Sequence, residues 1–166
     1  MRPDPAEAVV VVGYDSQWPS LFEQESRRVA GALGEAVVAV EHIGSTAVPG
    51  LAAKPVVDML AGLRTLALPT GAVDAMDELG FRKGRPRTHH VHAVLVGSDL
   101  WDRHLAFRDY LRARADEADD YAEFKRRLVH DVDGDRDRYV DGKEAYAAAL
   151  ERRARSWKRG LGSVGT

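Results

Sequence analysis

Residues 41–58 read EHIGSTAVPGLAAKPVVD, and this stretch decides the fold because it holds polar residues between two apolar segments. Residues 36–41 are rich in valine, which is typical of a buried strand, and residues 55–60 form the next predicted strand. The Gly-Ser pair stands between them, where the chain must turn. We therefore expect a strand, a turn and a second strand that carries Asp58 back toward the turn.

The turn at Gly44 and Ser45 has the composition of a phosphate-binding loop. Gly44 lets the main chain approach a phosphate closely, and the hydroxyls of Ser45 and Thr46 can donate hydrogen bonds to its oxygens. A carboxylate at Asp58, on the following strand, could hold a divalent cation that bridges it to phosphate oxygens. The other interpretation of these residues is a tight turn closed by a hydroxyl cap.

A longer string of residues extends this pattern beyond the turn. It comprises His42 to Thr46, Val48 to Leu51, Lys54 with Pro55, Asp58, His90 to His92, Phe107 to Arg112, Tyr121 with Lys125, and Tyr139 with Lys143. In this order the string resembles the GrpB family, within the nucleotidyltransferase-like superfamily, over roughly residues 8 to 150. The resemblance implies an α+β, nucleotidyltransferase-like fold: a mixed, twisted sheet with helices packed on it and a helical C-terminal half. It also implies that the Gly-Ser turn contacts nucleotide phosphates.

Members of that superfamily use two or three carboxylates on adjacent strands to hold magnesium. This sequence departs from the pattern, because Leu60 stands where the second carboxylate is expected and the later strand carries His90 and His92. Two alternatives follow. Asp58 could share a zinc or manganese ion with His90, His92 and His42, since imidazole suits those metals. Alternatively, Asp58 holds a magnesium ion that arrives bound to a triphosphate, with help from the glutamate that ends the first strand.

Basic residues elsewhere in the chain could complete such a site. Lys54 and Arg108 are candidate phosphate-binding cations, and Arg108 is also a candidate for orienting Asp58. Either cation could instead form a purely structural ion pair with this aspartate. The basic residues within 82–87 predict a loop whose arginines could meet phosphate.

Two tyrosine-lysine pairs have the i, i+4 spacing that places both side chains on one helix face. The pairs are Tyr121 with Lys125 and Tyr139 with Lys143. In each pair the tyrosine could stack on a base while the lysine meets a phosphate. Ordinary helix-surface pairs have the same spacing, so the pattern alone leaves both interpretations open.

Helices are expected around the sheet and throughout the C-terminal third. The predicted elements are a helix from Pro19 to near Gly34, a helix capped by Thr70 and ending near Leu79, a strand over 88–96, a helix capped by Ser98 and ending near 114, and helices over 116–129 and 135–158. We expect a single domain over residues 1–159 and a flexible tail over 160–166.

Composition excludes several classes of function. The 166 residues carry a formal net charge of −2, which gives no overall attraction to nucleic acid. The chain has no cysteine, so thiolate chemistry and disulfides are excluded. No apolar run approaches the ~20 residues of a membrane span. With no apolar segment at the N-terminus, we expect a cytoplasmic protein.

Two functional hypotheses follow. In the leading one, the protein binds a nucleotide or another phosphorylated small molecule at the Gly-Ser turn. As an enzyme it would transfer a nucleotidyl group to a small acceptor, with Asp58 orienting the phosphate through a metal and His92 or His42 acting as base. In the alternative, the protein is a catalytically degenerate member that senses a ligand or binds a protein, which Leu60 favours.

Overall fold

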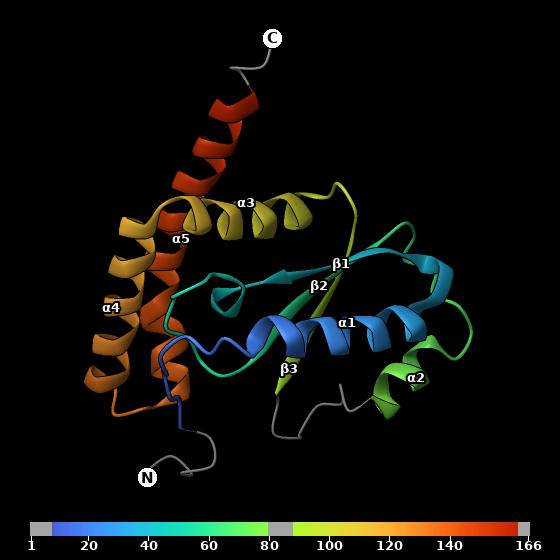
Figure 1. The fold of residues 1–166 in the computed structure, drawn as a ribbon, viewed down its shortest axis with the longest axis horizontal. Coiled ribbons are helices and arrows are strands. Elements are labelled where there is room, and N and C mark those ends of the chain that lie inside the picture. Colours follow the sequence, from blue (N-terminus) through green and yellow to red (C-terminus); the bar gives the residue numbers. More distant parts are fainter. Residues whose placement is uncertain (1–7, 80–87, 163–166) are drawn as a thin grey trace.

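Within residues 8–79 and 88–162, which the computed structural model describes, three strands form a mixed sheet surrounded by helices (Figure 1). The strands β1 (Val37–Ile43), β2 (Val57–Leu63) and β3 (His89–Leu95) lie in the order β1-β2-β3. β1 pairs with β2 in antiparallel orientation, and β2 pairs with β3 in parallel orientation. The predicted α+β fold with a mixed sheet is therefore confirmed.

Strand β2 is central and is more buried than either neighbour, as its apolar sequence predicts. Side chains alternate between the two faces of a strand. Met59 and Ala61 therefore share one face, where they pack with Val29 of helix α1 (Trp18–Leu33). Asp58 and Leu60 lie on the opposite face. The single polar residue of β2 is thus presented on the face that does not contact α1.

The C-terminal half consists of helices α3 (Asp99–Ala113), α4 (Ala115–Asp131) and α5 (Arg136–Gly162), as expected. Helix α3 packs on α5 and contacts all three strands (Figure 1). It approaches the sheet so closely that a Cβ atom added to Gly62 would lie 2.4 Å from the Trp101 ring. Because Gly62 shares the strand face of Asp58, helix α3 covers the Asp58 face.

A second apolar cluster joins the loop after the Gly-Ser turn to the helical half. Leu51 in that loop packs with Leu111 of α3, Tyr121 of α4 and Leu150 of α5, and all four are at most 3% exposed. This burial fixes the loop against three helices. The Gly-Ser turn is consequently held between the sheet and the C-terminal helices.

Several predicted boundaries shift in the structure. Ser98 caps α3 as expected, with its hydroxyl accepting a hydrogen bond from the Trp101 N–H at 3.3 Å. The prediction that Thr70 caps a helix is wrong, because α2 (Ala72–Glu78) has Gly71 at its N-cap and no side-chain cap. Gly71 takes a left-handed conformation there, which glycine adopts at little cost.

Helix α5 continues through Gly162, beyond the predicted start of a flexible tail at residue 160. The basic loop predicted at 82–87 lies outside the described residues. None of the helices in the described part of the chain combines the length and hydropathy needed to cross a lipid bilayer.

Candidate functional site

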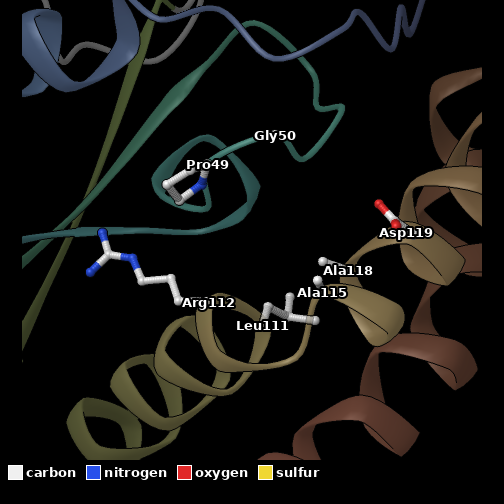
Figure 2. A pocket seen from close by; sticks show the side chains of 7 residues that line it. All are labelled: Pro49, Gly50, Leu111, Arg112, Ala115, Ala118 and Asp119. Atoms are coloured by element: carbon white, nitrogen blue, oxygen red, sulfur yellow. The ribbon is translucent and has the colours of Figure 1, made fainter.

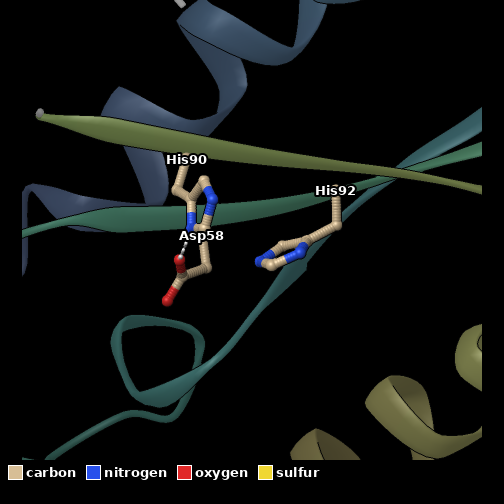
Figure 3. Close-up of side chains that lie close together, drawn as sticks. All are labelled: Asp58, His90 and His92. Atoms are coloured by element: carbon tan, nitrogen blue, oxygen red, sulfur yellow. Dashed lines mark ion pairs between the residues drawn. The ribbon is translucent and has the colours of Figure 1, made fainter. Parts of the chain in front are cut away.

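Asp58, His90 and His92 lie together on the sheet face that α3 partly covers (Figure 3). The parallel register pairs Asp58 with His90 and Leu60 with His92, so all three polar side chains project from one face of β2 and β3. Asp58 Oδ1 is 3.4 Å from His90 Nδ1, and the two imidazole centroids are 4.3 Å apart. One ligand atom from each residue lies within 4.8 Å of the others. This spacing is suitable for a shared metal ion.

The triad of Asp58, His90 and His92 is accessible from solvent on one side. The side chains of Asp58 and His90 are 32% and 44% exposed. Burial lowers the pKa of His92 below its ordinary value, and the nearby His90 lowers it further. A neutral imidazole keeps the lone pair that a metal ligand needs. Three protein ligands with an open side leave room for a further ligand on a bound ion.

The Gly-Ser turn lies directly against this triad. Gly44 has φ 72° and ψ −170°, and it leads into a short 3₁₀ helix over Ser45–Ala47. A Cβ atom added to Gly44 would lie 2.6 Å from Asp58 Oδ2. Only glycine therefore permits both the backbone angles and the close approach of the turn to the carboxylate. The predicted proximity of the Gly-Ser turn and Asp58 is present in the structure.

Lys125 connects α4 to the same turn. Its Nζ donates to Ser45 Oγ at 2.8 Å and to the carbonyl oxygen of Ala52 at 2.5 Å, and it lies 4.5 Å from the Tyr121 ring centroid. The residue is only 2% exposed. Burial, together with the nearby charge of Lys143, lowers the pKa of Lys125 to about 7.

Lys54 and Lys143 share the electrostatic environment of Asp58. Burial lowers the pKa of each lysine below its ordinary value, and the charge of Lys143 lowers that of Lys54 further. The Asp58 carboxylate acts in the opposite direction on both. Both lysines are thus close enough to Asp58 to interact electrostatically with it, which favours an anionic ligand nearby.

His42 does not join the triad, contrary to the prediction. It pairs with Met59 in the sheet and therefore projects from the opposite face to Asp58. Its ring stacks on Phe22 at 4.7 Å, and Nε2 lies 2.9 Å from Thr46 Oγ1. Burial lowers the pKa of His42 to about 4. The geometry assigns His42 and Thr46 to holding the turn, and it is incompatible with His42 acting as a base or ligand beside Asp58.

Arg108 also differs from its predicted position. Its guanidinium donates to Glu41 Oε2 at 2.6 Å and to the His42 carbonyl oxygen at 3.2 Å, and it pairs with Asp109. The prediction that Arg108 orients Asp58 is therefore wrong. Glu41 shares the strand face of Asp58, but its ion pair with Arg108 occupies it. It is not a free second carboxylate for magnesium.

The two tyrosines proposed to stack on a base are core residues. Tyr121 is 3% exposed and Tyr139 is 1% exposed, so neither offers its ring to a ligand. Lys143 lies over the Tyr139 ring with Nζ 5.8 Å from the centroid. The i, i+4 pattern correctly places each lysine beside its tyrosine. The tyrosine rings, however, pack in the protein core and not against a ligand base.

His104 is a further member of the site that the sequence pattern does not single out. Its ring on α3 lies 5.4 Å from that of His92. Burial, together with the nearby His92, lowers the pKa of His104 to about 4. No local spacing signals this contact, because it depends on how α3 crosses the sheet.

A hollow on the described surface lies away from the triad (Figure 2). It measures about 310 Å³ and lies between the loop that follows the turn and helices α3 and α4. Its lining residues are Pro49, Gly50, Leu111, Arg112, Ala115, Ala118 and Asp119. None of the triad contributes to it. We place the candidate site at the triad because convergent ligand atoms indicate chemistry more directly than a shallow hollow.

With this geometry in hand, comparison with known proteins identifies the family. The profile described as "GrpB protein" matches residues 8–153. The chain belongs to the GrpB family. The crystal structure of the conserved protein GrpB from Enterococcus faecalis matches with a TM-score of 0.74 and 32% sequence identity, covering 89% of this chain and 99% of that one.

Among curated relatives, the UPF0157 protein YqkA of Bacillus subtilis is 33% identical over 94% of this GrpB chain. The chain spans only 50% of the length of YqkA. A protein named dephospho-CoA kinase from Mycolicibacterium paratuberculosis is 29% identical over 93% of this chain, which covers 48% of that protein. The GrpB sequence thus also resembles part of some longer proteins.

Proposed function

We propose that this GrpB protein binds a phosphorylated small molecule, such as a nucleotide, together with one divalent transition metal ion. The observation that carries the proposal is the triad of Asp58, His90 and His92 lying against the Gly-Ser turn, with one ligand atom from each residue within 4.8 Å of the others. A metal at the triad and a phosphate at the turn would be neighbours. Positive charge on both sides of the phosphate would favour binding.

The ligand atoms at the triad favour zinc or manganese over magnesium. A pair of magnesium ions needs several carboxylate oxygens, whereas Leu60 occupies the expected second position and Glu41 is paired with Arg108. Two imidazoles and one carboxylate suit zinc or manganese. When bound, the ion would polarise a phosphoryl oxygen. We therefore propose a single zinc or manganese ion at Asp58, His90 and His92.

The reaction that fits this arrangement is transfer of a nucleotidyl or phosphoryl group from the bound molecule to a small acceptor. Lys54 and Lys143 would offset the charge that develops on the phosphate oxygens. His92 is assigned to the metal and not to proton transfer, because its ring lies within the ligand cluster. His104 beside it would orient His92 or exchange a proton with solvent.

A second candidate function is ligand sensing without turnover. Leu60 supports it, since the position of a second metal-binding carboxylate is occupied by a side chain that cannot coordinate an ion. Binding of the metal and the phosphorylated ligand is common to both candidates. Turnover of the bound ligand distinguishes them.

A thermal-shift screen of metal-free protein tests the binding proposal, because ligands that bind only the native state raise its stability. The panel contains nucleoside mono-, di- and triphosphates and dephospho-coenzyme A, each with magnesium, manganese or zinc. Dephospho-coenzyme A is included because of the resemblance to the kinase named above. We expect a rise in melting temperature that requires both the phosphorylated ligand and manganese or zinc.

Two aspartate variants locate the site. Asp58→Asn keeps the shape of the side chain but removes the ligand charge, and it should abolish the metal-dependent shift. Asp119→Asn removes a carboxylate from the hollow in Figure 2 and should leave the shift unchanged. Loss of the shift in Asp119→Asn but not in Asp58→Asn would move the binding site to that hollow and refute the proposal.

A further inference from the structure

Ser45 and Lys125 are in direct contact although 80 positions separate them in the sequence. Lys125 is 2% exposed, whereas Ser45 is partly accessible and stands at the turn beside Asp58. Within residues 8–79 and 88–162, no carboxylate forms an ion pair with Lys125. Its amino group is instead surrounded by the Ser45 hydroxyl, the Ala52 carbonyl oxygen and the Tyr121 ring.

These partners fit a neutral amine at Lys125. A neutral lysine has two N–H donors and one lone pair. One N–H can donate to the Ala52 carbonyl, and the lone pair can accept from the Ser45 hydroxyl across the same 2.8 Å contact. Burial, together with the charges of Lys143 and Arg126, lowers the pKa of Lys125 to about 7. The neutral form is therefore well populated at neutral pH.

We propose that Ser45 and Lys125 form a nucleophile–base pair, in which Ser45 Oγ attacks the phosphorus of a phosphoryl ligand and Lys125 accepts the serine proton. A serine activated by a neighbouring lysine is a known alternative to the serine–histidine arrangement. The choice of phosphorus as the electrophile rests on the function proposed above. The nucleophilic character of Ser45 rests only on its contact with Lys125.

The covalent step can be written with every atom assigned. The Ser45 Oγ–phosphorus bond forms, the bond from phosphorus to the leaving group breaks with its electron pair on the leaving group, and the hydroxyl proton passes to Lys125 Nζ. In the second half, a hydroxyl group of the small acceptor attacks phosphorus, and the Ser45–phosphorus bond breaks with its electron pair on Ser45 Oγ. Lys125 returns its proton to Ser45 Oγ, and the proton lost by the acceptor hydroxyl neutralises the leaving group through solvent.

Reaction with an uncharged alkyl fluorophosphonate tests the nucleophile without any metal or phosphorylated ligand. Attack by Ser45 forms the Oγ–phosphorus bond and releases fluoride, and the serine proton leaves as hydrogen fluoride. EDTA-treated protein is incubated with the reagent, and the products are followed by intact mass and peptide mapping. We expect one modification per chain, at Ser45, with a rate that rises with pH through an inflection near 7.

Variants separate the lysine from other effects. Ser45→Ala should abolish labelling, and Lys125→Met should slow it at least about 100-fold, because general-base catalysis typically contributes 10²–10⁴-fold. Lys125→Arg keeps a cation that cannot act as a base, so it should be as slow as Lys125→Met. Ser26→Ala, at a partly exposed serine of α1, is the control and should label like the wild type.

Absence of labelling at Ser45 in folded wild-type protein would overturn the proposal. A labelling rate in either lysine variant within about threefold of wild type would overturn it too, as would a rate independent of pH between 6 and 9. Circular dichroism confirms that each variant is folded. Because the reaction needs no metal, failure here together with a metal-dependent thermal shift would refute the nucleophile and leave the proposed binding function standing.

Discussion

Replacing Gly44 with alanine should damage the candidate metal site through a single added methyl group. The backbone at Gly44, with φ 72° and ψ −170°, lies in a region that is essentially restricted to glycine. Forcing another residue into it costs about 1–3 kcal/mol of stability. The added Cβ would also lie 2.6 Å from Asp58 Oδ2 and 3.2 Å from Asp58 Cβ. The Asp58 carboxylate must therefore move.

The cost of moving Asp58 is expected to appear in metal affinity. A displaced Asp58 carboxylate is no longer close enough to His90 and His92 to bind the same ion. Residues that position a ligand typically change metal affinity by about 10–100-fold when altered. We expect Gly44→Ala to unfold at lower urea concentration and to bind manganese or zinc about 10–100-fold more weakly. Urea denaturation followed by circular dichroism measures the first effect, and calorimetric titration measures the second.

Gly50→Ala is a matched control. Gly50 also has a positive φ, of 80°, but a Cβ atom there would meet no heavy atom within 4 Å. Its substitution introduces backbone strain without pressing on Asp58, so stability should fall while metal affinity stays at the wild-type value. If Gly44→Ala binds metal as tightly as Gly50→Ala does, the turn does not position Asp58 and the reasoning is refuted.

Three further perturbations test how the site is held in place. Folding lowers the pKa of His42 from 6.5 to about 4, so the stability that depends on the neutral ring is fully present above pH 6.5 and is lost as pH falls through 4. Urea titrations should show a decrease in unfolding free energy on the order of 3 kcal/mol over this range. His42→Gln should remove this pH dependence. In a double-mutant cycle, Arg108→Ala and Glu41→Ala should couple by about 1 kcal/mol, since the pair is only partly buried; strict additivity would contradict this. Gly62→Ala should cost about 1–3 kcal/mol in unfolding free energy, because its Cβ would collide with Trp101 of α3; wild-type stability would mean that α3 does not pack so closely.

Local sequence patterns predicted the parts of the site that are formed by residues adjacent in the sequence. The valine-rich segment, the Gly-Ser pair and the apolar segment around Asp58 specify a strand, a turn and a strand by composition alone. The alternation of His90 and His92 places both on one face, whichever strand they pair with. Their alignment with Asp58 required the parallel pairing of β2 with β3, which no local pattern encodes.

Long-range packing decided what the sequence could not. Tyr121 and Tyr139 have the i, i+4 spacing to a lysine that is common on exposed helix faces, but packing of the helices buries both side chains in the core. The sequence pattern places Arg108 on a helix, but its contact with Glu41 depends on how α3 crosses the sheet. The contact of Lys125 with Ser45 likewise depends on how α4 docks against the turn. Such contacts are set by tertiary packing, which overrides the local pattern.

Calorimetric titration of EDTA-treated protein with zinc and manganese tests the metal site most directly. Wild-type protein should bind one ion per chain, and His92→Ala should lose that binding while retaining its fold. His130→Ala is the control, since the His130 side chain is 91% exposed and has no role in the proposed site. A single site that is lost in His92→Ala and kept in His130→Ala would agree with the geometry of the triad. Absence of binding by the wild type, or equal binding by His92→Ala, would contradict it.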